Sequence, residues 1–290
     1  MKTNSKDLLN TISNLITVGN SVLPIIKNYL FDVQDNVLSI TTTDLENTTI
    51  CSVEVTDSIN GKWCVPFKFR EVLSTLKNDD LELSFNEVLT IKSEQGEYQL
   101  PLFDASEFPS TPETDGEFIE LNYEFISAIQ KTAFATGNDE LRPIMTGVSV
   151  RENEVCATDA HKLAKVVLSE KIGEFIIPKK ACGIISKLDS CKARHNGINL
   201  EVVSDNFRLI SKTIDGKFPN YNAVIPNESV TEFTTNRIAL IQSIKRVALF
   251  SNKTTNLIEF NLSKDNSFIK GVDNDHSQKG EEKINGTLTY

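Results

Sequence analysis

The 290-residue sequence lacks the features that mark membrane, secreted and metal-bound proteins. No apolar run approaches the ~20 residues that a helix needs to cross a bilayer, and the first residues have no apolar signal-peptide core. The five cysteines are scattered without a CxxC pair, and only three histidines accompany them. This pattern argues against a disulfide scaffold or a zinc site and favours reduced thiols. We therefore expect a soluble, cytoplasmic protein with no metal and no cofactor.

Motifs of catalysis are also missing. The sequence has no nucleophile elbow, no glycine-rich phosphate loop and no cluster of metal ligands. Asp159 and His161 leave one enzymatic alternative, a small hydrolase that uses them as an acid/base pair. We predict instead that the chain is not an enzyme.

Charge and length set further bounds. The formal net charge of −10 argues against bulk affinity for nucleic acid of the simple basic kind. The length allows two or three domains.

An internal repeat organises the chain. Helical spacing of apolar residues recurs in five stretches, residues 6–18, 66–77, 122–135, 178–192 and 236–249. Strand pairs lie between and after these stretches, and a proline opens the second helix of the first two copies. Phe-Pro closes the first copy at Pro109 and the second at Pro219. The repeat predicts an α+β fold with two helices packed on antiparallel sheets, in domains 1–117, 118–228 and 229–290, the third incomplete.

The stretch from Leu141 to Val166 predicts an antiparallel hairpin in the second copy. Its first strand includes Ile144, the chain turns at residues 151–154, and the return strand ends at Thr158. Arg142, Thr158 and His161 would then lie near one end of the hairpin. Taken alone, this pattern favours a hairpin with an ordinary polar end.

The order of these segments resembles the bacterial sliding clamp, the beta subunit of DNA polymerase III. The resemblance covers essentially the whole chain and is strongest at residues 134–138, 141–144, 158–163, 218–226 and 251–253. It implies three similar domains per chain and two chains that close a ring around duplex DNA. It also implies that the chain tethers a replicative polymerase and is placed on DNA by a clamp loader.

The charge distribution fits a ring whose helices line the pore. The five predicted helical stretches total +8, so the rest of the chain carries −18. A solvated face is the better explanation for any single lysine, but it does not explain the bias of all five stretches. The residues expected to face DNA are Lys68, Arg70, Lys77, Lys131, Lys179, Lys187, Lys192, Arg237, Lys245 and Arg246.

The resemblance also implies a cleft between the second and third domains that binds a short peptide of each partner. The matching residues are Arg142, Met145, Thr158, Ala160, His161, Lys162, Leu163, Pro219, Ala223 and Val224. Buried core is an equal alternative for Met145. Three departures affect this cleft: Ala160 replaces the family's glycine, the hairpin before Thr158 is shorter, and the family's C-terminal segment is absent.

The resemblance implies a head-to-tail homodimer of the full-length form. The matching residues are Tyr98 and Leu100 on an edge of the first domain, with Leu249 and Phe250 after the helix of the third. Glu281 and Glu282 add candidate ion pairs, which are weak when exposed. A degenerate, monomeric clamp relative that only scaffolds partners is the alternative.

Overall fold

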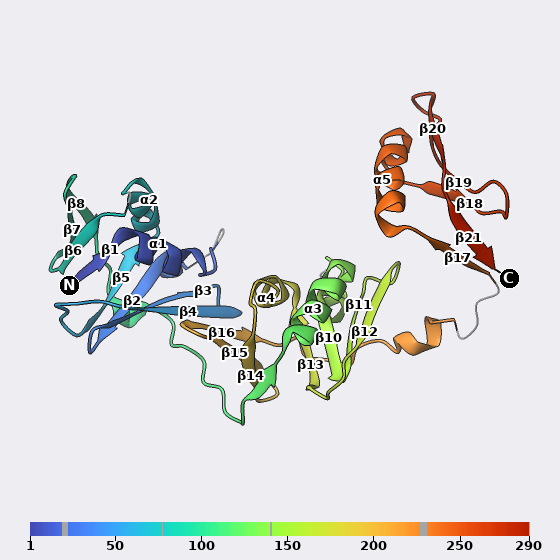
Figure 1. The fold of residues 1–290 in the computed structure, drawn as a ribbon. Helices are drawn as coiled ribbons and strands as arrows, with labels where there is room; N and C mark the ends of the chain where they lie inside the picture. Colours follow the sequence, from blue (N-terminus) through green and yellow to red (C-terminus); the bar gives the residue numbers. More distant parts are fainter. Residues whose placement is uncertain (19–22, 77, 140, 227–230, 290) are drawn as a thin grey trace. The chain divides into compact units, whose positions relative to one another are not determined.

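The computed structural model describes residues 1–18, 23–76, 78–139, 141–226 and 231–289. The chain forms two compact units, Met1–Phe218 (unit 1) and Pro219–Tyr290 (unit 2), which are described separately. Unit 1 holds the helices and strands of predicted copies one and two, and unit 2 holds those of copy three (Figure 1). The predicted boundary at residue 228 lies outside the described residues.

The described residues of copy one form two α-helices, two short 3-10 helices and eight strands. Its first half consists of β1 (Lys2–Asn4), α1 (Ser5–Ser13), the 3-10 helix η1 (Pro24–Lys27), β2 (Asn28–Gln34), β3 (Val37–Thr43), β4 (Asn47–Glu54) and β5 (Gly61–Pro66). Its second half consists of α2 (Lys68–Thr75), β6 (Asp80–Phe85), β7 (Val88–Ser93), β8 (Gly96–Pro101) and η2 (Ala105–Glu107).

Copy two repeats this order. Its first half consists of β9 (Ile119–Leu121), α3 (Tyr123–Thr132), η3 (Ala133–Ala135), η4 (Pro143–Thr146), β10 (Gly147–Glu152), β11 (Glu154–Thr158), β12 (Leu163–Val167) and β13 (Gly173–Pro178). Its second half consists of α4 (Lys179–Ile185), β14 (Cys191–His195), β15 (Asn199–Ser204) and β16 (Phe207–Lys212).

Unit 2 shows the beginning of the same order. It consists of η5 (Tyr221–Val224), β17 (Glu232–Thr235), α5 (Arg237–Val247), η6 (Ala248–Phe250), β18 (Ile258–Asn261), β19 (Phe268–Asp273), β20 (Gln278–Lys283) and β21 (Gly286–Thr289). Strands β18, β19 and β20 form one antiparallel sheet, and β17 pairs with β21.

An asparagine caps the first helix of every copy. The side chain of Asn4 accepts a hydrogen bond from the N–H of Lys6, that of Asn122 from Phe125, and that of Asn236 from Ala239. Each cap satisfies a backbone donor that the first helical turn leaves unpaired. The recurrence of this cap supports the repeat independently of the element order.

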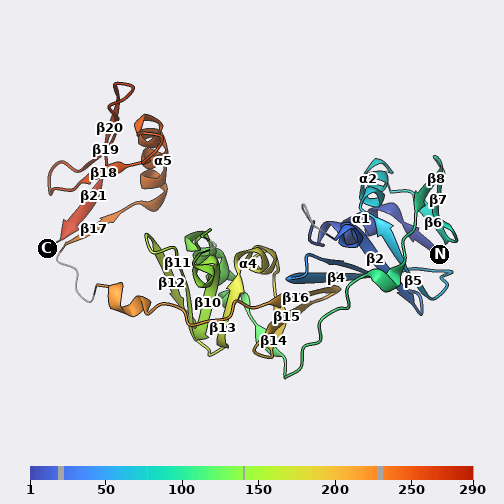
Figure 2. The ribbon, with the colours of Figure 1, turned by 180° about the vertical axis from the view of Figure 1, so that it is seen from behind.

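An eight-stranded sheet joins the two copies of unit 1. Its order is β5-β2-β3-β4-β16-β15-β14-β9, so the first half of copy one continues into the second half of copy two. The seam is the antiparallel pair β4–β16, in which Cys51 lies opposite Phe207 and Asn47 lies opposite Ser211. Figures 1 and 2 show α1 to α4 along one side of unit 1 and the eight-stranded sheet on the other.

Two large apolar cores lie between the helices and sheets of unit 1. Copy one buries residues such as Leu8, Phe31 and Phe69, and copy two buries Phe125, Val148 and Ile185. The core of unit 2 is small among the described residues, with Val247, Ile269 and Ile284 buried at its centre.

The structure confirms the helix and hairpin order but corrects several bounds. The second helix of copy two ends at Ile185, because the segment from Cys191 to His195 forms β14 and pairs with β15 and β9. The segment from Pro143 to Thr146 is a 3-10 helix that precedes the strand, so the hairpin begins at Gly147. Pro66 and Pro178 end strands and the helices begin after them, at Lys68 and Lys179.

Candidate nucleic-acid interface and partner surface

The helices carry a positive charge that the rest of the chain opposes. Helices α1 to α5 have formal charges of 0, +1, 0, +2 and +3 within their observed bounds, a total of +6. The remaining residues therefore carry −16. The predicted excess of positive charge on the helices remains after the helix ends are corrected, although the total falls from +8 to +6.

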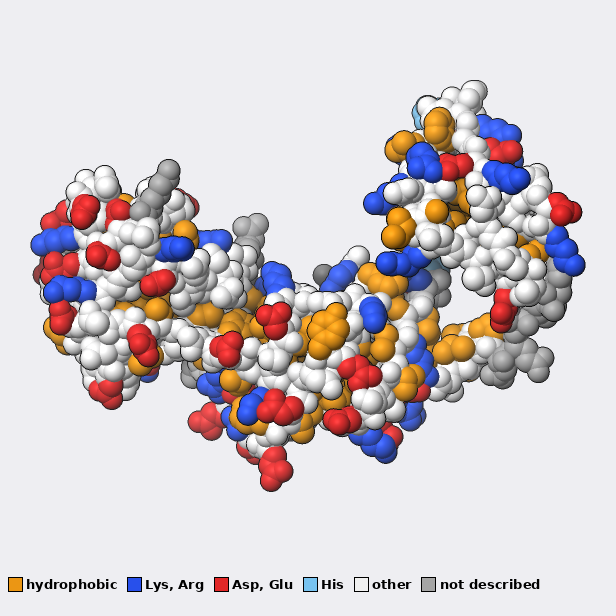
Figure 3. All heavy atoms as spheres, in the orientation of Figure 1, with side chains coloured by type: hydrophobic (Ala, Val, Ile, Leu, Met, Phe, Trp, Pro, Cys, Tyr) orange, Lys and Arg blue, Asp and Glu red, His pale blue; other side chains and the backbone are white. Residues whose placement is uncertain are grey.

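Most helix cations of unit 1 are exposed and have no ion pair among the described residues. Lys68 and Arg70 extend from α2, Lys131 from α3 and Lys179 from α4, where the Lys179 ammonium donates to Asn138 Oδ1 at 2.9 Å. Figure 3 shows basic and acidic side chains mixed over the strand side of unit 1. Many cations of the strands and loops of unit 1 are paired, for example Lys62 with Asp32, Arg151 with Glu174 and Lys171 with Glu152. The cations left without a carboxylate partner are therefore concentrated on the helices.

Three predicted DNA-facing residues of unit 1 need correction or fall outside the structure. Lys192 lies on strand β14, not on a helix, and pairs with Glu120 at 3.0 Å. Lys187 lies in the turn after α4, where it lines a groove of about 710 Å³ between the ends of α1 and α4. Lys77 lies outside the described residues.

In unit 2, Arg237, Lys245 and Arg246 lie on α5 and are exposed. The Arg246 guanidinium holds Glu282, its Nε lying 2.9 Å from Glu282 Oε2. Hydrogen bonds from Arg246 and Ser243 lower the pKa of Glu282 to about 2. Arg246 is therefore partly neutralised, and Arg237 and Lys245 have no ion pair among the described residues.

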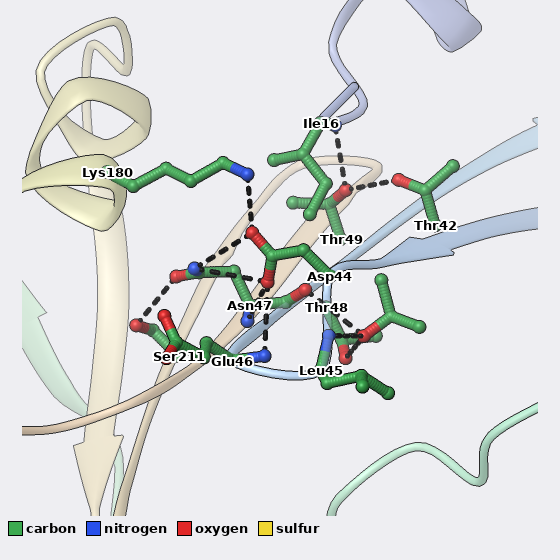
Figure 4. Close-up of polar contacts among 11 residues, drawn as sticks. Ile16, Thr42, Asp44, Leu45, Glu46, Asn47, Thr48, Thr49, Lys180 and Ser211 are labelled. Atoms are coloured by element: carbon green, nitrogen blue, oxygen red, sulfur yellow. Dashed lines mark hydrogen bonds and ion pairs between the residues drawn. The ribbon is translucent and has the colours of Figure 1, made fainter. Parts of the chain in front are cut away.

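Lys180, which the sequence did not single out, connects the two copies of unit 1. Its ammonium binds Asp44 Oδ2 in the turn between β3 and β4 (Figure 4). Burial favours a higher pKa for Asp44, but the hydrogen bonds from Lys180 and from the N–H groups of Asn47 and Glu46 lower it overall. Lys180 and Lys179 are neighbours in sequence, and only the tertiary contact shows which of them the seam uses.

Asn47 and Ser211 complete the polar contacts at this seam. The Ser211 hydroxyl donates to Asn47 Oδ1 at 2.9 Å, and Asn47 Nδ2 lies 3.3 Å from Asp44 Oδ1 (Figure 4). Both side chains are buried, with Asn47 1% and Ser211 0% exposed.

The Thr158–Leu163 segment forms a tight turn between β11 and β12. The Thr158 hydroxyl donates to Lys162 O at 2.7 Å and accepts from Ala160 N at 3.1 Å, while Asp159 Oδ1 accepts from the N–H groups of His161 and Lys162. Ala160 has φ +75°, a conformation that disfavours a side chain. Ala160, which the resemblance matched to a glycine, therefore adopts a positive φ, the conformation that suits glycine.

Asp159 is held by a cation and by backbone donors. The Lys162 ammonium binds its carboxylate, and that contact together with the two N–H donors holds the pKa of Asp159 far below its usual range. A carboxylate with so low a pKa is a poor base at neutral pH. The acid/base pair of Asp159 and His161 therefore gains no support.

The same turn occurs in copy one. The Thr43 hydroxyl donates to Asn47 O at 3.2 Å and accepts from Leu45 N at 3.1 Å, and Leu45 has φ +76°. Asp44 Oδ1 accepts from the N–H groups of Glu46 and Asn47. The Thr-Asp pair thus forms the same turn in both copies. In copy one the turn lies at the seam, and in copy two it lies between β11 and β12.

Of the other cleft residues of unit 1, Met145 lies on η4 and Arg142 directly precedes it, so neither lies on a strand. Arg142 Nε lies 2.9 Å from Asp139 Oδ2, so the charge of Arg142 is partly neutralised. Met145 is half-buried, and its carbonyl accepts from Gly137 N at 2.8 Å. His161 and Lys162 are exposed and Leu163 is half-buried.

Three cleft residues belong to unit 2. Pro219 is half-buried at its start, and Ala223 and Val224 are exposed on η5, with Val224 72% exposed.

The predicted dimer residues divide into exposed and buried ones. Tyr98 is exposed on β8, an edge strand of the sheet β1-β6-β7-β8, and Leu249 and Phe250 are exposed on η6. Leu100 is only 7% exposed because it packs into the core of copy one, so its interface role is corrected. Glu281 pairs with Lys279, and Glu282 is held by Arg246 within unit 2.

Two absences apply to the residues that the structure describes. Among them, no group of three or more His, Cys, Asp or Glu side chains is placed to hold a metal ion. No described helix combines the length and the apolar character needed to cross a membrane.

Comparison with known proteins finds matching domains and relatives along the chain. Residues 3–112 match the model of the DNA polymerase III beta subunit, N-terminal domain, and residues 121–220 match that of its central domain. The beta sliding clamp of Chlamydia pneumoniae is 28% identical over 97% of this chain and 82% of its own length. That of Synechococcus elongatus is 29% identical over 90% of this chain and 76% of its own length.

Solved structures agree with this placement at the level of the fold. A sliding clamp from Bartonella birtlesii, 23% identical, matches with a TM-score of 0.93 over 100% of this chain and 85% of that one. The DNA polymerase III beta subunit of Thermotoga maritima, 22% identical, matches with a TM-score of 0.86 over 99% of this chain and 84% of that one. Together with the two matching domain models, these relatives show that the chain belongs to the family of bacterial sliding clamps, the beta subunit of DNA polymerase III.

Proposed function

We propose that this protein is a DNA sliding clamp, a non-catalytic processivity factor that encircles duplex DNA and tethers a replicative DNA polymerase. Family membership supports the function, and the helix cations of unit 1 that have no carboxylate partner carry the proposal for this chain. Lys68 and Arg70 lie on α2, Lys131 on α3 and Lys179 on α4, and these helices run along one side of the unit (Figure 1). Exposed cations of this kind bind phosphates without reading sequence.

Weak phosphate contacts suit a protein that slides. Each contact releases counterions and weakens as salt rises, so none holds the duplex at one place. The acidic remainder of the chain discourages binding elsewhere. The protein then stays on DNA because the ring encircles the duplex, and its affinity for phosphates only steers the duplex to the helices.

We assign partner binding to the surface around the Thr158–Leu163 turn of unit 1, and we propose Pro219, Ala223 and Val224 of unit 2 as further contact residues. The exposed His161 and the half-buried Leu163 provide a polar and an apolar contact for a short peptide. The polymerase and a clamp loader are the partners of this surface. The proposed place of action is the cytoplasm.

Ring closure requires contact between chains, which we propose to be head to tail in a homodimer. Tyr98 on the free edge of β8 is one side, and Leu249 and Phe250 on η6 are the other. Their exposure supports this assignment. The three-domain division at residues 117 and 228 is part of the same proposal.

The lifetime of the protein on DNA tests encirclement. We expect a chain loaded on circular DNA to stay bound and to dissociate within seconds once the circle is cut. Lys131→Glu combined with Lys179→Glu should lower loading, while Lys171→Glu, which removes a strand-side cation paired with Glu152, should leave it unchanged. Equal lifetimes on linear and circular DNA would remove the basis of the proposal.

The monomeric scaffold is the alternative, and light scattering separates the two. A strict monomer at micromolar concentration, with peptide binding intact, would favour the scaffold. His161→Ala should weaken peptide binding without changing the mass of the assembly.

A further inference from the structure

A cavity of about 350 Å³ lies between α1 and α2 in copy one. The two helices are neighbours (Figure 1), and every described residue that lines the cavity belongs to this copy. Ile12, Leu15 and Ile16 line it with apolar side chains and are at most 7% exposed. The volume falls within the range of small-ligand sites, which are apolar and contain a few polar groups that orient the ligand.

Three residues that line this cavity carry polar side-chain groups with no hydrogen-bond or ion-pair partner among the described residues. They are Tyr29 on β2, with its hydroxyl, and Arg70 and Glu71 on α2, with their opposite charges. Adjacent residues on a helix do not face each other, so Arg70 and Glu71 form no pair. The cavity therefore combines an apolar lining with two donors and one acceptor that the fold leaves unused.

The buried Tyr29 hydroxyl has no evident structural use. Tyr29 is 4% exposed, and a buried hydroxyl without a partner destabilises the folded chain. Its ring packs against Phe67, with centroids 4.6 Å apart, and phenylalanine would make the same contact. Burial raises the pKa of Tyr29 to about 12, so the hydroxyl keeps its proton at neutral pH and remains a hydrogen-bond donor.

Copy two shows that the fold does not require these polar groups. The pairing of β2 with β5 corresponds residue for residue to that of β10 with β13, and by this register Val148 takes the place of Tyr29. Val148 is 0% exposed, so an apolar side chain meets the packing need at this position. Two uncharged residues, Cys182 and Gly183, take the places of the two charged residues of α2.

The unused groups define the chemistry of a ligand. Tyr29 and Arg70 donate hydrogen bonds, and the ionised carboxylate of Glu71 only accepts them. A nucleobase carries carbonyl and N–H groups along one edge and has a flat face that packs on aromatic side chains. Guanine fits best, because its carbonyl oxygen accepts while its neighbouring N–H groups match the two oxygens of a carboxylate. A bare phosphate fits less well, because Glu71 offsets the charge of Arg70.

We propose that this cavity binds one unpaired nucleobase, with guanine preferred. The base lies against Phe67 and the apolar lining, and its polar edge meets Tyr29 and Glu71. Lys68, exposed on the same helix, is available to the phosphate beside the base. The inference goes beyond the proposed function, since encirclement and phosphate contacts need no contact with a base.

Two labelled octanucleotides test the proposal on the full chain by fluorescence anisotropy. One contains only thymine and the other has one central guanine, so their phosphate charges are equal. We expect the guanine strand to bind about fivefold to tenfold more tightly, the lower end of what a well-paired base edge contributes. A strand with hypoxanthine in place of guanine lacks the amino group and should lose part of this preference.

Three variants test whether the preference arises in the cavity. Tyr29→Phe removes only the hydroxyl, so the preference should fall to about twofold or less while the free energy of unfolding stays equal or rises. A merely structural Tyr29 would lower the free energy of unfolding and leave the preference intact. Glu71→Gln should also reduce the preference. Glu87→Gln is the matched control, since it removes an exposed carboxylate between β6 and β7 of the same copy, and it should keep the preference.

Competition separates the two sources of a base. Displacement of the guanine strand by deoxyguanosine monophosphate, but not by deoxyribose phosphate, would make a free nucleotide the ligand. Displacement by unlabelled strands alone would make the ligand a base within a strand. Equal binding of the two octanucleotides, no binding, or a preference that survives both Tyr29→Phe and Glu71→Gln would overturn the proposal. Retention on circular DNA, measured without oligonucleotide, tests the clamp function separately.

Discussion

The polar seam between copies one and two should respond strongly to Asn47→Ala. The substitution removes the acceptor of the buried Ser211 hydroxyl and the amide that contacts Asp44. Two net hydrogen bonds at about 1 kcal/mol each, plus about 1–3 kcal/mol for leaving a buried hydroxyl without its acceptor, predict a loss of about 3–5 kcal/mol. For a unit of this size the loss corresponds to a fall in Tm of about 6–20 °C.

Urea unfolding followed by tryptophan fluorescence measures this loss. Trp63 is the single tryptophan of the chain, lies on β5 of unit 1 and stacks on Phe85 with ring centroids 4.3 Å apart. Ser39→Ala is the matched control, since it breaks a hydroxyl contact of 3.1 Å between two strands of copy one, with Ser52 on β4, and leaves Asn47 and Ser211 in place. Its cost should be about 1 kcal/mol or less.

A double mutant decides whether the orphaned hydroxyl is the reason. Ser211→Ala removes that hydroxyl, so Asn47→Ala with Ser211→Ala should cost less than the two single changes together. Strict additivity, or a loss below about 0.5 kcal/mol for Asn47→Ala, would refute the reasoning.

Three other predictions follow from the glycines, the turns and unit 2. Ala160→Gly should raise the free energy of unfolding by up to about 1 kcal/mol in urea, because Ala160 has φ +75°; a loss would contradict a strained turn. Gly147→Ala should cost about 1–3 kcal/mol, since its Cβ would lie 2.6 Å from Ile177 O, while Gly183→Ala, whose Cβ meets open space on α4, should be neutral or stabilising. Arg246 and Ser243 lower the pKa of Glu282 from 4.5 to about 2, so the stability from this ionised pair is present above pH 4.5 and is lost as pH falls toward 2. Carbon NMR of the Glu282 carboxyl should show its pKa rising in Arg246→Ala, and an unchanged pKa would contradict the pairing.

The repeat, the helix order and the hairpins could be predicted from the sequence because each depends on local pattern. Asp35 and Asn36, for example, adopt the positive φ that a two-residue hairpin turn needs. Helix ends were less predictable. The segment from Cys191 to His195 alternates buried and exposed residues, but only its pairing with β15 identifies it as a strand.

The sequence predicted the total charge of the helices well and the roles of individual cations less well. Lys179 and Lys180 are adjacent lysines, and they are distinguished only by the contact of Lys180 with Asp44, 136 residues away. Leu100 matched an interface position but packs into the core of copy one, although Tyr98, two residues earlier on β8, is exposed. The Asn caps and the repeated Thr-Asp turn were visible in the sequence and are the signals that would have aligned the copies more securely.

The continuous ladder of β4 and β16 has a mechanical consequence for unit 1. Copies one and two are joined by backbone hydrogen bonds. The angle between these two copies therefore follows from the twist of neighbouring strands, which leaves little room for a hinge. Any change in the bend of this unit would have to break or slide that ladder. Its stiffness, set by five facing residue pairs, thus determines how faithfully one copy orients the next.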